Sequence, residues 1–140
     1  MPTMADDSGL SVRALEGAPG VYSKRYSGEQ NLSGQDLDDA NNAKLLNALR
    51  GMNDTSASYS CAAAFVDESG EWVAMGETHG RVIDEARGRE GFGYDPYFFS
   101  TELAKTFGEA AVEEKEAVSH RGRAFRALVQ ALRYDRRILA

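Results

Sequence analysis

The residues best suited to chemistry lie near the start of the chain, where Asp6 and Asp7 precede Ser8 and Gly9. Neighbouring carboxylates supply the oxygen ligands that Mg²⁺ prefers. A carboxylate in such a place can also orient or deprotonate an attacking water molecule. This segment is therefore a candidate for the acidic half of an active site.

A second candidate segment reads Gly91-Phe92-Gly93-Tyr94-Asp95-Pro96. Its glycines let the backbone approach a ligand closely, and its two aromatic rings offer flat faces on which a base can stack. The Asp95 carboxylate is a hydrogen-bond acceptor when ionised. The alternative is a structural turn that leads into a strand over residues 97–99.

The third candidate combines Lys115 with Ser119-His120-Arg121-Gly122. Lys115 and Ser119 are four residues apart and share one helical face. His120 and Arg121 lie near the start of the last helix, where backbone N–H groups and the helix dipole favour anions. Gly122 is unfavourable within a helix, so it predicts close backbone approach or a break between two helices. The alternative is a solvated basic helix end.

These segments need a framework of strands and helices. Alternating or apolar runs predict strands over residues 10–14, 59–66, 72–78 and 97–99, with 81–83 extending the sheet. Apolar residues at helical spacing predict helices over 36–49, over 113–118, and from 119 or 121 to 134. The polar stretch 41–44 falls on the solvated face of the first helix. We expect one α/β domain over residues 1–140 with hairpins, and hence no purely parallel sheet.

Composition narrows the class of protein. The 140 residues are 42% hydrophobic and carry a formal net charge of −6, which argues against general nucleic-acid or acidic-membrane binding. The single cysteine, Cys61, lies in an apolar run and is interpreted as a small buried hydrophobe in a reducing compartment. No stretch is apolar enough to span a bilayer, and residues 1–4 lack the features of a secretory signal. A cytoplasmic protein is expected.

Taken together, the segments resemble the inosine triphosphate pyrophosphatase family, which hydrolyses non-standard purine nucleoside triphosphates. The resemblance covers residues 5–134 and is carried by five ordered blocks: 5–10, 17–23, 91–96, 113–115 and 119–122. It implies Mg²⁺-dependent hydrolysis of inosine, deoxyinosine or xanthosine triphosphate to the monophosphate and pyrophosphate. It also implies an elongated α/β fold built around a mixed sheet.

The resemblance assigns a role to each site residue. Asp7 would be the general base and a metal ligand, and Asp6 would support it in both roles. The residues that would bind substrate are Ser8, Phe92, Gly93, Tyr94, Asp95, Lys115, His120 and Arg121. Arg121 would donate to the 6-oxo group of the purine, and Asp95 would accept its N1–H, so adenine would leave both groups without a partner.

Family members carry a strand-helix-strand-helix portion ahead of the Asp-Asp-Ser-Gly segment, with a phosphate-binding loop and a glutamate near the metal. Residues 1–4 stand in its place, so we expect the C-terminal portion of the fold. An unpaired sheet edge would then favour a homodimer or higher oligomer. Three alternatives follow: a family hydrolase, a weak or inactive purine-nucleotide-binding remnant, or an unrelated Mg²⁺ phosphohydrolase that uses Asp6 and Asp7.

Overall fold

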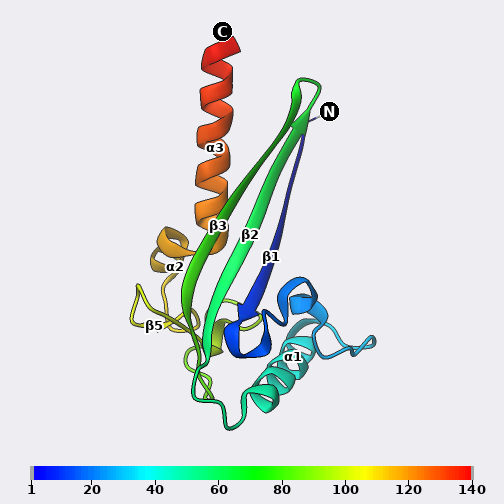
Figure 1. Cartoon of the computed structure of the whole chain (residues 1–140), viewed down its shortest axis with the longest axis vertical. Helices are drawn as coiled ribbons and strands as arrows, with labels where there is room; N and C mark the ends of the chain where they lie inside the picture. The colour runs from blue at the N-terminus through cyan, green and yellow to red at the C-terminus, as the bar shows by residue number, and fades with distance from the viewer. Residues whose placement is uncertain (1, 140) are drawn as a thin grey trace.

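The computed structural model describes residues 2–139, with side chains for 2–134. Three long strands dominate it: β1 (Thr3–Val12), β2 (Ser56–Asp67) and β3 (Gly70–Val82), followed by the short β4 (Phe98–Ser100) and β5 (Lys105–Thr106). The five strands lie in chain order, and each pairs antiparallel with the next (Figure 1). The expected hairpins are confirmed. The expected mixed sheet is antiparallel throughout these described residues.

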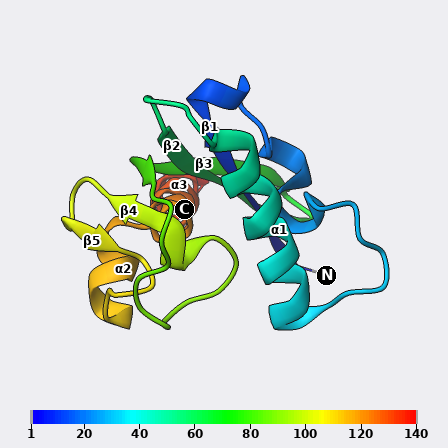
Figure 2. The same cartoon turned by 90° about the horizontal axis from the view of Figure 1, so that it is seen from below.

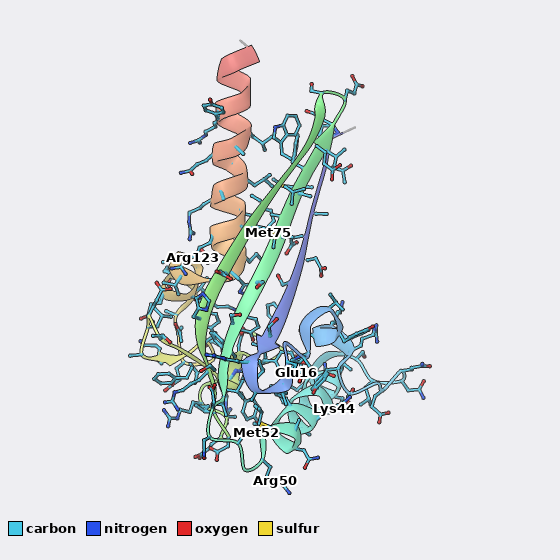
Figure 3. All side chains as sticks on the ribbon, viewed as in Figure 1. Glu16, Lys44, Arg50, Met52, Met75 and Arg123 are labelled. Carbon is cyan, nitrogen blue, oxygen red and sulfur yellow. The ribbon has the colours of Figure 1, made fainter. Side chains whose placement is uncertain are left out.

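Alternation along the strands gives the sheet two different faces. Tyr59, Cys61 and Ala63 of β2 are buried, and their intervening neighbours are more exposed. The register aligns Cys61 with Ser8 on β1 and with Gly76 on β3, so these residues share the covered face. The opposite face carries exposed side chains such as Met75 (Figure 3).

In the described part of the chain, three α-helices accompany the sheet: α1 (Gly34–Leu49), α2 (Val112–Val118) and α3 (His120–Leu139). The 3₁₀ helices Arg13–Leu15 and Gly20–Arg25 lie between β1 and α1, and a third, Asp95–Tyr97, directly precedes β4. Seen from below, α1 lies on one side of the molecule, and β4, β5 and α2 lie on the other (Figure 2). Within residues 2–139, no helix combines the length and the apolar character needed to cross a membrane.

The helix α3 runs beside the β2–β3 hairpin and covers one of its faces (Figure 1). Ala124 and Leu128 are fully buried against Cys61 and Ala63. Gly76 allows this close approach, because a Cβ there would meet the backbone of α3. Arg123 fixes the position further by donating to the carbonyl oxygen of Glu77 at 3.0 Å and to Glu102 at 2.7 Å (Figure 3).

A second buried cluster lies at the lower end of the sheet, where α1 joins it. Leu45 and Leu49 of α1 pack there with Leu10, Tyr59 and Phe98. The interpretation of residues 41–44 as a solvated face is wrong for two of them, because Asn41 and Asn42 are only 3% and 5% exposed. The side-chain amide nitrogens of both residues donate to backbone carbonyl oxygens in distant segments, which offsets part of the cost of burial, while Asn42 Oδ1 has no partner among the described residues.

The outer edge of β1 is only partly covered. Near its C-terminal end, the Ser23 hydroxyl accepts a hydrogen bond from the Leu10 amide at 2.8 Å, and Val12 donates to the Ala18 carbonyl oxygen at 3.0 Å. The segment after β1 thus replaces a neighbouring strand at this end. The described residues place no strand along the outer edge from Thr3 to Gly9.

Candidate active site

The Asp95 carboxylate is the centre of the candidate site. Its side chain is only 5% exposed, yet it accepts three hydrogen bonds. Tyr59 Oη donates to Oδ1 at 3.1 Å, and Oδ2 accepts from the Phe92 amide at 3.1 Å and from Lys115 Nζ at 2.6 Å. The buried charge is therefore paired and well hydrogen-bonded, as burial of a carboxylate requires. One side chain joins β2, the 91–96 segment and α2.

The two aromatic residues of this segment behave differently. Phe92 is 73% exposed, with Lys115 Nζ 5.0 Å from its ring centre. Tyr94 is 6% exposed, and its hydroxyl donates to the Ser23 carbonyl oxygen at 2.6 Å. Burial raises the pKa of Tyr94, so that hydroxyl stays a donor. Phe92 therefore offers an open face for stacking, whereas Tyr94 anchors the segment in the core.

The α1 helix holds the same segment from the other side. The Gly93 amide donates to Asp38 Oδ2 at 2.9 Å, and Asn42 Nδ2 donates to the Gly93 carbonyl oxygen at 3.0 Å. Asp38 and Asn42 are four residues apart on one helix face, and this spacing is the only sign in the sequence that both side chains bind the same residue. Local sequence patterns otherwise indicate no such role for either residue, because their partner Gly93 lies more than fifty positions away.

The junction between α2 and α3 presents the basic residues. Ser119 has an extended backbone and separates the two helices. Its Oγ accepts a hydrogen bond from the Gly122 amide at 3.0 Å, an N-cap for α3. Gly122 confirms the expected close approach, since a Cβ there would meet the Glu116 carbonyl oxygen. Lys115 on α2 and His120 with Arg121 on α3 consequently lie next to one another in space.

His120 packs against the ring of Tyr59. Their ring centres are 4.6 Å apart and the planes differ by 14°. Burial, together with repulsion from Lys115 and Arg121, lowers the pKa of His120 to about 4. Its Nδ1 is buried and has no hydrogen-bond partner among the described side chains. A neutral imidazole with an unsatisfied nitrogen is suited to bind a polar group of a ligand or a water molecule.

Strand β1 places its two acidic residues on different faces. The pairing with β2 is regular from Thr3 to Val12, so Asp6 and Asp7 point in opposite directions. Asp6 faces α3, where its Oδ2 lies 3.3 Å from Arg121 Nε and 3.9 Å from Cys61 Sγ. Burial raises the pKa of the Cys61 thiol, so it remains protonated, and its interpretation as a small buried side chain is confirmed.

The structure therefore divides the expected site. Asp6 and Ser8 share the face on which α3 places Arg121, and His120 begins the same helix. Tyr59 connects His120 with the other expected substrate-binding residues, because it stacks on His120 and donates to Asp95. Around Asp95 lie Phe92, Gly93 and Lys115. Asp7 is exposed on the opposite face. No group of three metal-ligating side chains occurs among the described residues. The exposed Asp7 carboxylate still fits Mg²⁺, which commonly uses one or two carboxylates together with substrate phosphates and water.

This arrangement is suited to recognising a flat, polar, anionic molecule. Phe92 offers a stacking face, Lys115 and Arg121 supply positive charge, and the neutral His120 supplies a hydrogen-bonding ring. The Asp6–Arg121 pair is exposed at 27% and 59% of its side chains, so it is weak and leaves Arg121 able to turn to a ligand.

Comparison with known proteins gives a consistent result. The Ham1 family matches residues 1–131. A dITP/XTP pyrophosphatase of Geobacter sulfurreducens is 50% identical over 131 residues, which are 91% of this chain and 63% of that protein. One of Desulfotalea psychrophila is 47% identical over 125 residues, covering 89% of this chain and 54% of that protein. The chain thus spans less than two thirds of these relatives.

A solved structure agrees with the sequence relatives. The Staphylococcus aureus Ham1 protein superposes with a TM-score of 0.87 at 38% identity, over 96% of this chain and 68% of that one. The expected resemblance is confirmed in both sequence and fold: the chain belongs to the Ham1 family.

Proposed function

We propose that this protein hydrolyses non-standard purine nucleoside triphosphates, such as those of inosine, deoxyinosine or xanthosine, to the monophosphate and pyrophosphate. Its relatives are named dITP/XTP pyrophosphatases, which supports the substrate class. The observation that carries the proposal is the cluster of Phe92, Asp95, Lys115 and His120 around Tyr59. It brings four of the expected substrate-binding residues to one place.

In this proposal the purine stacks on Phe92, and Arg121 donates to its 6-oxo group. His120 Nδ1 and the segment at Gly93 and Asp95 shape the rest of the base pocket. The Asp95 side chain is 5% exposed and both its oxygens already accept hydrogen bonds, so it acts by holding the Phe92 amide and Lys115 in place of the expected direct contact with the ring N1–H. Ser8 contacts the nucleotide from β1. These hydrogen bonds discriminate against adenine, which would face Arg121 with a second donor.

For the chemical step, we propose that Asp7 removes a proton from the water that attacks the α-phosphorus, while the bond to the bridging oxygen of pyrophosphate breaks. Mg²⁺ would be held by the Asp7 carboxylate and the phosphate oxygens, and it would supply neutralisation of the developing charge. Asp6 forms a weak, exposed ion pair with Arg121, which Arg121 can exchange for the ligand. Because Asp7 lies on the face of β1 opposite Ser8 and Arg121, this assignment requires the α-phosphate to reach Asp7 around the outer edge of β1.

A second candidate function is binding of purine nucleotides without turnover. The observation that favours it is the position of Asp7 on the face opposite Asp6 and Arg121, with no group of three metal-ligating side chains among the described residues. The family match makes an unrelated phosphohydrolase the least suitable of the three alternatives.

Pyrophosphate release from inosine triphosphate and Mg²⁺ separates the two remaining functions. We expect the Asp7→Asn variant to release pyrophosphate at least about 100-fold more slowly than the wild type, because a general base contributes factors of that size. Asp67→Asn is the matched control, since Asp67 lies in the distant β2–β3 turn. Equal rates for wild type and Asp7→Asn would contradict the role of Asp7.

Binding of inosine monophosphate, measured by calorimetry, tests the base pocket in either case. We expect Arg121→Ala to weaken binding about tenfold, as loss of one charge-assisted hydrogen bond predicts. Arg133→Ala, on an exposed part of α3, should leave it unchanged. Binding without any pyrophosphate release would establish the second function, and the absence of both saturable binding and pyrophosphate release would overturn both.

A further inference from the structure

Tyr59 lies outside every motif that predicted the site. It nevertheless contacts both parts of the proposed base pocket, which are the 91–96 segment and His120 at the start of α3. It belongs to β2, and its side chain is buried with 6% exposure among Phe98, Phe107 and His120. Its ring stacks on His120 at the start of α3, and its hydroxyl reaches Asp95 in the 91–96 segment. The 91–96 segment and the start of α3 are connected through this one side chain.

The contact with Asp95 extends to the residues that face the ligand. Tyr59 Oη is 3.1 Å from Asp95 Oδ1, while Asp95 Oδ2 receives the Phe92 amide at 3.1 Å and Lys115 Nζ at 2.6 Å. A carboxylate held at one oxygen presents its other oxygen in a fixed direction. The orientation of the Asp95 carboxylate, and with it the hydrogen bond to the Phe92 amide, therefore depends on the Tyr59 hydroxyl.

The contact with His120 has a parallel effect. A nearly coplanar stack fixes the orientation of the imidazole, and thereby the direction of the unpaired Nδ1. Burial and the neighbouring Asp95 carboxylate raise the pKa of Tyr59 well above its usual value, so its hydroxyl remains a donor throughout the working pH range.

We propose that Tyr59 is the positioning residue of the base pocket, orienting Asp95 with its hydroxyl and His120 with its ring. This role rests on the proposed function, because it presumes that the pocket binds a purine nucleotide. It predicts that loss of the hydroxyl alone weakens base recognition and leaves phosphate binding unaffected.

The test compares Tyr59→Phe with wild type in calorimetric binding of inosine monophosphate and of inorganic pyrophosphate. We expect the dissociation constant for inosine monophosphate to rise about tenfold, because Asp95 loses one of its donors, and that for pyrophosphate to stay unchanged. Tyr26→Phe is the matched control. Tyr26 packs against the same core cluster on the α1 side, beside Lys44.

Amide hydrogen exchange in the ligand-free protein gives an independent readout. Phe92 and Gly93 are neighbours, but the Phe92 amide binds Asp95 and the Gly93 amide binds Asp38. Tyr59→Phe should accelerate exchange at Phe92 about tenfold relative to Gly93, whereas general destabilisation would accelerate both.

The outcomes separate the two proposals. A wild type that neither releases pyrophosphate from inosine triphosphate nor binds inosine monophosphate overturns the proposed function and this role with it. A wild type that binds, together with a Tyr59→Phe variant that binds equally well, overturns the role of Tyr59 alone. Equal acceleration at Phe92 and Gly93 also overturns it, because it would show that the hydroxyl stabilises the fold without orienting Asp95.

Discussion

His120 is the first residue of α3, and its ring is buried against Tyr59. This burial keeps the imidazole of the candidate site neutral at neutral pH. The pKa of His120 is lowered to about 4, first because burial disfavours the charged ring and then because Lys115 and Arg121 repel it. At neutral pH the His120 imidazole is therefore neutral, beside Lys115, which pairs with Asp95, and Arg121, which pairs with Asp6. The exposed Arg121 suits an anionic ligand, and the imidazole suits a polar base edge.

This shift predicts a loss of stability in acid. In the unfolded chain His120 binds a proton below its ordinary pKa of 6.5, whereas the folded protein resists that proton until about pH 4. The stabilising contribution is thus complete above pH 6.5 and declines as the pH falls from 6.5 to 4. With solvent screening of the partly exposed ring, its size is on the order of 2 kcal/mol.

Urea unfolding at pH 7 and pH 4.5 measures this contribution. The free energy of unfolding should fall more in wild type than in His120→Gln, because the variant lacks the titrating group. The only other histidine is His79, so a His79→Gln background allows the ring protons of His120 to be followed directly by NMR. Parallel losses of stability in wild type and His120→Gln would contradict the assigned cause.

At the scale of elements, the sequence predicted most of what local patterns control. Apolar or alternating runs over residues 59–66 and 72–78 located β2 and β3, and helical spacing located α1, α2 and α3. The lengths of β2 and β3 were underestimated, because pairing with a neighbouring strand continues each of them beyond its apolar run. Adjacency in the sequence indicated that Asp6 and Asp7 act as a pair, but the regular register of β1 separates them.

Contacts across long sequence distances were the part that local patterns could not predict. Asn41 and Asn42 are polar, which indicated a solvated face, but their partners are the carbonyl oxygens of Lys24 and Gly93. Tyr59 likewise resembles an ordinary strand residue until its partners are known. Hydrophobic patterns locate elements, whereas the satisfaction of buried polar groups depends on the assembled fold.

The close packing of α3 against β3 at Gly76 gives a prediction at the scale of elements. A Cβ at position 76 would meet the backbone at His120 and Ala124, neither of which can move without shifting α3. Gly76→Ala should therefore lower the free energy of unfolding by about 1–3 kcal/mol, as overpacking does in buried sites. Because α3 carries His120 and Arg121, the variant should also bind inosine monophosphate more weakly than wild type.

The neighbouring Met75 provides the control. Its side chain is 64% exposed on the opposite face of the same strand, so Met75→Ala should change the free energy of unfolding by less than about 0.5 kcal/mol. Urea unfolding of both variants at pH 7 is sufficient. Equal stability of Gly76→Ala and wild type would show that α3 does not require this close contact.

At the scale of the whole molecule, the sheet is covered unevenly. One face carries α3 and the buried clusters, whereas the other exposes Val73 and Met75 at 57% and 64%. The register aligns Ala5, Ala64 and Val73 in one row on that exposed face, beside the open edge of β1. An open strand edge next to small apolar side chains favours pairing with another strand.

We therefore expect this protein to associate through the outer edge of β1, and Ala5→Glu to prevent it. In an edge-to-edge dimer, the substitution would bring the two added carboxylates close to each other and to the Asp7 residues of both copies. Repulsion between these charges opposes association, and the net charge of the protein is already −6. Ala117→Glu makes the same charge change on exposed α2 and should leave association intact. Light scattering at micromolar concentration should give twice the mass of one chain for wild type and Ala117→Glu, and a single mass for Ala5→Glu. A monomeric wild type would instead show that the charges of Asp6 and Asp7 are enough to protect the edge.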